Sequence, residues 1–87
     1  MQQVAVLFME ENTRNKISKL HIGNLIKEEL ERQERTVAWL ARKLCCDRSN
    51  IYKIFKRSTI DTELLLRVSQ ILNCDFFEFY RSEIFKQ

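Results

Sequence analysis

The segment from Thr36 to Arg57 concentrates the positive charge of this chain. It contains a single acid, Asp47, and its basic residues are Arg42, Lys43, Arg48, Lys53, Lys56 and Arg57, which gives a local net charge of +5 (six minus one). The whole chain carries only +3, so the remainder carries −2. A basic cluster of this kind is typical of a surface that attracts the phosphates of nucleic acid. The alternative is a solvated polar surface that binds nothing.

Side chains within this segment also have the chemistry needed to read base pairs. Arg48 can bond both acceptors of a guanine, Asn50 can pair with adenine, and Lys53 can reach guanine. The expected base-contacting residues are Arg48, Ser49, Asn50 and Lys53. Contacts with the DNA backbone are expected from Thr36, Tyr52, Lys56 and Arg57, and from Arg14 and Lys16 in an N-terminal arm. A plain solvated linker is an equally good interpretation of that arm.

Two short helices joined by a turn must position these groups. Thr36 is the expected N-cap of the first helix, whose apolar residues recur at helical spacing. Those residues are Val37, Leu40, Ala41 and Leu44. The turn contains Cys45 and Cys46, and Asp47 is the expected N-cap of the second helix, over about residues 47–57, with Ile51, Ile54 and Phe55 facing inward. Trp39 falls outside the apolar stripe, so it either packs beside the core or stacks near the DNA backbone.

Further helices are expected on both sides of this unit. One runs from Ile22 to Gln33, with His21 before it as a surface or capping residue and a surface pair between Glu28 and Arg32. Another runs from Asp61 or Thr62 to Leu72. A last short helix follows Asn73 and Cys74, with Asp75 as its expected cap.

Composition favours one all-helical domain. The chain has 87 residues, 45% of them hydrophobic, with no proline and one glycine, which leaves little chemistry for hairpins and tight turns. We expect an N-terminal extension over residues 1–20 and a helix-turn-helix domain over 21–87. No apolar run approaches the roughly 18 residues of a membrane helix, and the first ten residues lack the basic start of a signal peptide. The expected location is the cytoplasm, associated with the nucleoid.

Aromatic residues crowd the C-terminal segment. Four aromatics within five residues exceed what one side of a short helix can bury in so small a domain. We therefore expect a cover over the core or a homodimer interface formed by Phe76, Phe77, Phe79, Tyr80 and Phe85.

Nothing in the sequence favours catalysis or a bound cofactor. No paired carboxylates, Ser-His-Asp set, glycine-rich phosphate loop or small-molecule site stands out. The three cysteines and His21 match no zinc-ligand spacing, so we expect free thiols and no metal. A redox role for Cys45 and Cys46 is a minor hypothesis.

The order of helices, with the Leu40-Ala41 pair and Ile51 and Ile54, resembles the lambda-repressor-like, Cro-type helix-turn-helix regulators of bacteria. The likeness covers roughly residues 22–80 and includes the final Leu-Asn-Cys-Asp-Phe-Phe from Leu72. It implies a compact five-helix domain that binds double-stranded operator DNA as a dimer and regulates transcription. By this likeness Arg48, Ser49 and Lys53 match the family's base-contacting positions.

The sequence also departs from that family's pattern. Val37 stands where a phosphate-binding Gln is usual, and Cys45 stands where the turn usually has Gly. We therefore expect either a positive φ at Cys45, at some energetic cost, or a turn that differs in detail. Leu30 and Phe55 replace a buried Arg and Glu, so we expect these two apolar side chains to meet.

A protein-interaction module is the alternative function. In that interpretation the chain is an antitoxin-like or phage-derived adaptor, and its aromatic C-terminus binds a partner protein.

Overall fold

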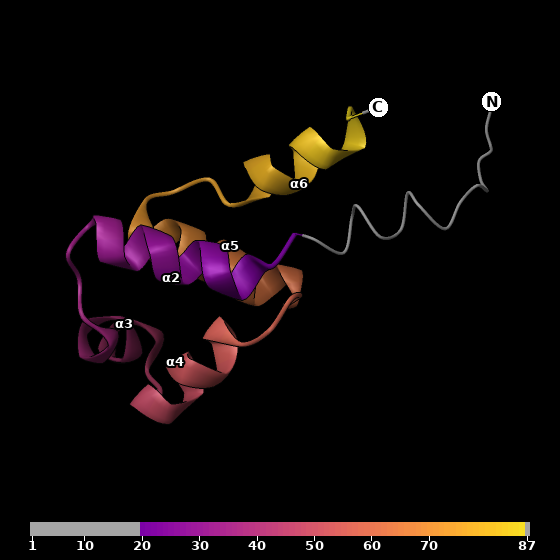
Figure 1. Ribbon diagram of the computed structural model, residues 1–87. Coiled ribbons are helices and arrows are strands. Elements are labelled where there is room, and N and C mark those ends of the chain that lie inside the picture. Colours follow the sequence, from indigo (N-terminus) through magenta and orange to yellow (C-terminus); the bar gives the residue numbers. More distant parts are fainter. Residues whose placement is uncertain (1–19, 87) are drawn as a thin grey trace.

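Five helices make up the part of the chain that the computed structural model describes, residues 20–86 (Figure 1). They are α2 (Ile22–Arg32), α3 (Val37–Leu44), α4 (Arg48–Phe55), α5 (Thr62–Leu72) and α6 (Phe77–Ile84). No strand occurs within residues 20–86, so the all-helical class expected from composition is confirmed. Arg14 and Lys16, with nearly all of the expected extension over 1–20, lie outside the described residues.

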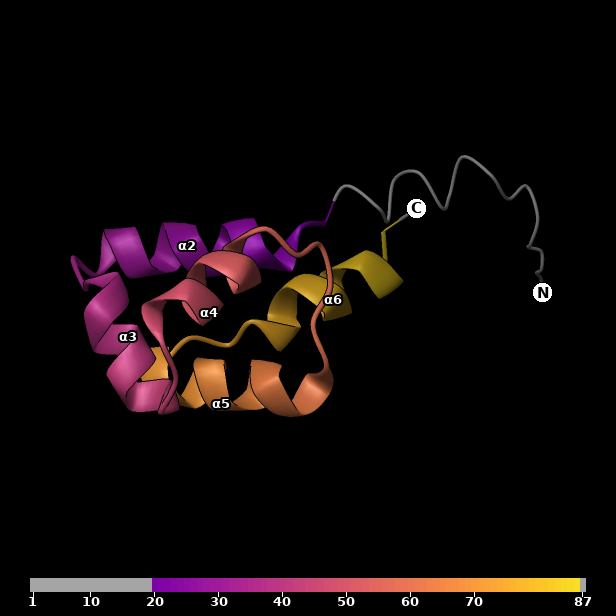
Figure 2. The same ribbon diagram turned by 90° about the horizontal axis from the view of Figure 1, so that it is seen from below.

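The core lies where α2, α3, α4 and α5 meet. Helix α2 packs against α4 and α5, and α3 packs against the same two helices. Figure 2 shows α3 across one end of the other helices. In Figure 1, α3 and α4 lie on one side of α2 and α6 lies on the other. The buried apolar residues are Ile22, Ile26, Leu30, Leu40, Ala41, Leu44, Ile51, Ile54, Phe55, Leu65, Val68, Leu72 and Phe76.

This core agrees with the apolar stripes of the sequence. Leu30 and Phe55, the pair that replaces a buried Arg and Glu in the resembled family, are 2% and 7% exposed and belong to the same cluster. No polar or charged residue of the described chain is buried among them. Burial of this apolar surface is the main force that holds α4 against α2.

Gly23 sets the approach of α2 to α4, a role that the sequence did not indicate. The Gly23 N–H donates to the Arg57 carbonyl at 2.9 Å, and the Ile22 N–H donates to the Ser58 carbonyl at 3.1 Å. A Cβ on Gly23 would lie 2.4 Å from the carbonyl oxygens of Ile54 and Phe55. The start of α2 therefore satisfies carbonyl groups at and just beyond the end of α4, which only a residue without a side chain allows.

Three of the helix starts have side-chain caps, and among them Thr36 is the cap that the sequence predicted. The N-caps His21, Thr36 and Asp61 each accept a hydrogen bond from the backbone N–H three residues later, at 3.1, 3.0 and 2.7 Å. Each bond satisfies a backbone donor that has no partner within its helix. Asp47 does occupy the N-cap of α4, but its side chain makes no capping bond.

Two local predictions were wrong. Asp75 does not cap α6; the N-cap is Phe76, already in a helical conformation, and the Asp75 carboxylate lies 3.7 Å from the Arg81 guanidinium. Arg32 pairs with Glu29 at 2.5 Å and not with Glu28. Glu29 is preferred because it also accepts from Gln33, whose side chain reaches across to α5.

Candidate nucleic-acid interface

The turn between α3 and α4 is closed by backbone hydrogen bonds. Cys45 adopts a left-handed conformation, with φ 58° and ψ 48°, which is the first of the two alternatives that its place in the turn left open. The Cys45 and Cys46 N–H groups donate to the carbonyls of Arg42 and Ala41, at 3.1 and 2.9 Å. This arrangement satisfies the last carbonyls of α3 and lets the chain reverse into α4. A cysteine in this conformation costs more than a glycine would.

Helix α4 presents a polar face to solvent. Its buried residues, Ile51, Ile54 and Phe55, hold it on the core. The residues on its exposed face or just beyond its end are Arg48, Ser49, Asn50, Tyr52, Lys53, Lys56 and Arg57. The Tyr52 side chain is 53% exposed and its ring meets that of Phe55 edge-on, with centroids 6.1 Å apart. The structure therefore brings the expected α4 residues onto one accessible surface.

Helix α4 is shorter than the expected span of 47–57. It ends at Phe55, with Lys56 as its C-cap, and the Arg57 N–H donates to the Ile54 carbonyl at 3.0 Å. Just beyond this end, the carbonyls of Arg57 and Ser58 accept bonds from the start of α2. Arg57 is consequently fixed by its backbone while its side chain stays exposed.

The positive side chains of α3 and α4 have no acidic partners in the described structure. The ion pairs within residues 20–86 join Lys27 to Glu31, Arg32 to Glu29, Arg81 to Asp75 and Glu78, and Lys86 to Glu83. All of these residues belong to α2 or lie in or beside α6. The cations without such a pair include Arg35, Arg42, Lys43, Arg48, Lys53, Lys56, Arg57 and Arg67. The charges around α3 and α4 are thus available to an external anion.

The start of α3 offers further donors to an anion. Thr36 Oγ1 accepts from the Trp39 N–H at 3.0 Å, so the Thr36 side chain is engaged in capping. Among the described backbone hydrogen bonds, none uses the N–H groups of Val37 and Ala38. Unsatisfied donors at a helix start favour negative charge. A backbone contact near Thr36 would therefore come from these amides more than from the Thr36 hydroxyl.

Trp39 is half-buried between the core and two cations. Its ring packs against the core cluster. The Arg35 guanidinium lies 4.4 Å from the ring centroid, and the Lys43 ammonium lies 5.9 Å away. Cations over an indole face are attracted to its electron-rich surface. Of the two interpretations left open by the sequence, packing beside the core is the one this structure bears out.

Arg67 is a residue near this surface that the sequence did not single out. It lies on α5, and its Nη2 donates to the Leu44 carbonyl at the end of α3, at 3.5 Å. The only available signal was a basic residue on the polar side of this amphipathic helix, next to Val68. Because the contact spans 23 residues of sequence, spacing along the chain could not reveal it.

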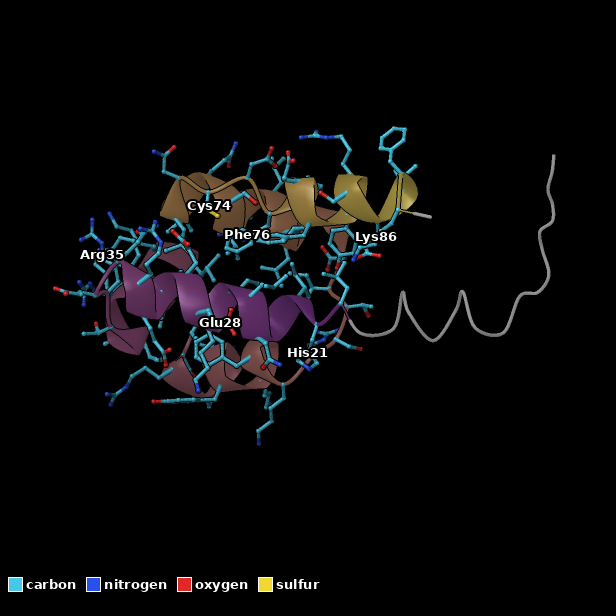
Figure 3. The ribbon with its side chains drawn as sticks, turned by 45° about the horizontal axis from the view of Figure 1, so that its top comes forward. His21, Glu28, Arg35, Cys74, Phe76 and Lys86 are labelled. Carbon is cyan, nitrogen blue, oxygen red and sulfur yellow. The ribbon has the colours of Figure 1, made fainter. Side chains whose placement is uncertain are left out.

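The C-terminal aromatics divide into buried and exposed groups. Phe76 was expected in a dimer interface, but it is fully buried, and Figure 3 shows it directed inward toward α2. Phe77 and Tyr80 are half-buried against the core. Phe79 and Phe85 keep 37% and 74% of their surface exposed, and the neighbouring Ile84 keeps 70%. Phe76, Phe77 and Tyr80 therefore form the expected cover over the core, whereas Phe79 and Phe85 offer surface to a partner.

All three thiols are free. Cys45 is exposed, whereas Cys46 and Cys74 are half-buried. Burial, and then the nearby Glu29 carboxylate, raises the pKa of the Cys74 thiol. Within residues 20–86, no three potential metal ligands gather at one place. Over the same span, every helix is too short or too polar to cross a bilayer.

Comparisons of the chain with models of known protein families, with curated proteins and with solved structures found no match.

Proposed function

We propose that this protein is a sequence-specific DNA-binding regulator of transcription, with α4 lying in the major groove. The observation that carries this proposal is the set of unpaired cations around α3 and α4, when every described ion pair lies on α2 or in or beside α6. Cations left without carboxylate partners can neutralise DNA phosphates and release the counterions that were bound to the DNA. The proposed fold relationship is with the lambda-repressor-like, Cro-type regulators, in keeping with the order of the helices.

The first turn of α4 is the proposed reading element. Arg48, Ser49 and Asn50 are all exposed there, and the backbone of the helix is held by three buried residues. Bidentate bonds from Arg48 to guanine and from Asn50 to adenine would each discriminate by about 1–3 kcal/mol. The amides at the start of α3, with Lys56 and Tyr52, would bind the backbone and set the register of the protein on the duplex.

A homodimer is the proposed binding form. One α4 helix covers too few base pairs for strong selectivity, whereas two copies would place recognition helices about 34 Å apart on an inverted repeat. Ile84 and Phe85 are the most exposed large apolar residues of the described chain, and they lie at the end of α6, away from α4 (Figure 1). An exposed apolar cluster of this kind suits self-association without covering the basic surface.

The proposal is tested by the salt dependence of binding to random-sequence duplex DNA. We expect affinity to fall linearly with the logarithm of salt concentration, with a slope of about −0.9 for each phosphate contacted. Lys56→Gln should reduce the size of this slope by about 0.9, because it removes one cation from the proposed surface. Lys86→Gln is the matched control, since Lys86 lies just beyond α6 and pairs with Glu83 of that helix, and it should leave the slope unchanged. Absence of binding to any duplex at low salt would overturn the proposal.

A further inference from the structure

A surface pocket lies where α4, α5 and the end of α3 meet. Its volume is about 310 Å³. The residues that line it are Leu44, Cys46, Asn50, Lys53, Ile54, Arg57, Leu64 and Arg67. The apolar members come from the core side, and the polar members are exposed side chains at its rim. The pocket is therefore a shallow depression with an apolar floor and a polar rim.

Three cations and no carboxylate surround this pocket. Lys53 and Arg57 are four residues apart at the end of α4, and Arg67 comes from α5. None of the three takes part in an ion pair within residues 20–86. Like charges gathered around one pocket repel, and an anion between them would relieve that repulsion.

Arg67 is held in a position suited to an anion at this site. Its Nη2 donates to the Leu44 carbonyl at 3.5 Å, at the negative end of α3. That bond uses one of five guanidinium donors, and the remaining donors are available. A guanidinium anchored by one edge loses less freedom when it binds a phosphate, because part of its ordering has already taken place.

We infer that this pocket binds a phosphate group of the DNA backbone on one flank of the groove occupied by α4, with Arg67 as an added anchor from α5. The inference rests on the proposed function, because the pocket shares Asn50 and Lys53 with the exposed face of α4. A helix in the major groove has phosphates on both sides, and the pocket lies on the α5 side. Lys53 then contacts phosphate instead of the guanine expected from the sequence.

A free phosphorylated small molecule has the same chemistry as a backbone phosphate, and the site could accept either. The DNA backbone is favoured because the pocket adjoins the proposed reading turn and gathers its cations at an exposed rim. A small effector would instead need most of its surface enclosed.

The test compares Arg67→Met with the wild type in salt titrations of duplex binding. We expect the slope of log affinity against log salt to shrink by about 0.9, equally for random and selected sequences, because a phosphate contact carries no sequence information. Arg67→Lys should keep most of the slope. Lys86→Met is the control of equal charge change, and its slope should match the wild type.

Four outcomes decide the matter. The expected slope change supports the inference. If the wild type binds DNA and the slope is unchanged in Arg67→Met, the pocket inference alone is overturned. Urea denaturation measures any loss of stability in Arg67→Met, so that binding can be corrected for the unfolded fraction. Binding of inorganic pyrophosphate can be measured by NMR of the arginine side-chain N–H signals. If Arg67→Met loses pyrophosphate binding but keeps the wild-type DNA slope, the inference is also overturned and the pocket is assigned to a free anion. Failure of the wild type to bind any duplex overturns both this inference and the proposed function.

Discussion

Cys45 is a single residue that sets the geometry of the turn before α4 at an energetic cost. Its φ of 58° is a conformation that glycine adopts freely and that a side chain strains. Asn73, the C-cap of α5, has a similar φ of 53°, but asparagine tolerates this region better than most residues. Of these two left-handed C-caps, Cys45 is therefore the more strained.

Replacement of this cysteine by glycine should stabilise the protein. We expect Cys45→Gly to raise the free energy of unfolding by about 1 kcal/mol, since it relieves the left-handed strain and the thiol is exposed. Urea denaturation would measure the change. Cys45→Ala is the matched control, because it removes the same thiol but keeps the Cβ, and it should give no comparable gain. Equal stability of the glycine and alanine variants would contradict this account.

Gly23 should be the most sensitive small residue in the described chain. Gly23→Ala places a Cβ 2.4 Å from the Ile54 and Phe55 carbonyl oxygens, so α2 must move away from α4. We expect a loss of about 2–3 kcal/mol in the free energy of unfolding, measured by thermal or urea denaturation, as is usual for overpacking. Asn24→Ala, at the next and exposed position, should change it by less than about 0.5 kcal/mol. A Gly23→Ala variant as stable as the wild type would show that this contact is looser than described.

At the scale of the elements, a hydrogen-bonded network ties the end of α2 to the end of α5. Gln33 Nε2 donates to Glu29 Oε2 and to the Leu72 carbonyl, each at 2.7 Å. Arg32 donates to both oxygens of the Glu29 carboxylate. These bonds, Arg32 first and Gln33 second, lower the pKa of Glu29. The ionised carboxylate is therefore the form that the fold favours.

This lowered pKa predicts an acid-dependent loss of stability. The stabilisation is fully present above the ordinary carboxyl pKa of about 4.3 and is lost as the pH falls through the lower value of the folded protein. We expect the free energy of unfolding to fall less steeply below about pH 4.3 in Glu29→Gln than in the wild type. Urea denaturation across this range would show it. Glu28→Gln, an exposed change on the same helix, is the control and should show the pH dependence of the wild type. If Glu29→Gln also showed the wild-type pH dependence, the Glu29 network would not stabilise the protein as described.

The helices themselves could largely be predicted from the sequence, because apolar spacing and capping residues are local signals. Ile22 and Thr62 begin helices where the patterns indicated, and the left-handed conformation of Cys45 is one of the two alternatives that its position left open. What escaped were contacts between distant segments. Gly23 against the α4 carbonyls and Arg67 against the Leu44 carbonyl each depend on how helices pack, which no local spacing encodes.

The same reason explains the divided outcome for the aromatic segment. The sequence indicated that four aromatics within five residues exceeded what one helix face could bury, but not which of them would enter the core. Phe76, the N-cap of α6, is fully buried, whereas Phe85, its C-cap, is 74% exposed. The base-contacting and backbone-contacting roles of the α4 residues stay predictions.

At the scale of the whole molecule, the basic surface of α3 and α4 and the apolar end of α6 lie on different sides of α2 (Figure 1). Such a separation permits DNA binding and self-association at the same time. It also lets the two be tested separately, since a change at the end of α6 need not alter the charge around α4.

The dimer proposal predicts a specific effect at Phe85. Phe85→Ser should lower the fraction of dimer while changing the stability of the monomer by less than about 0.5 kcal/mol, because the side chain is 74% exposed. Sedimentation equilibrium over a range of concentrations would measure the association. Leu66→Ser is the control, an exposed apolar residue on α5, and should leave association unchanged. A wild-type protein that stays monomeric at all concentrations, with or without DNA, would rule the dimer out.

The claim that α4 reads DNA is tested most directly by selection of bound sequences from random duplex DNA, performed with the wild type and with Arg48→Ala. The account predicts that the wild type enriches an inverted repeat, with half-site centres about 10 base pairs apart or a multiple of that spacing. It also predicts a guanine in each half-site that becomes degenerate in Arg48→Ala. Failure to enrich any sequence, or enrichment of the same sequence with the same preference by both proteins, would contradict it.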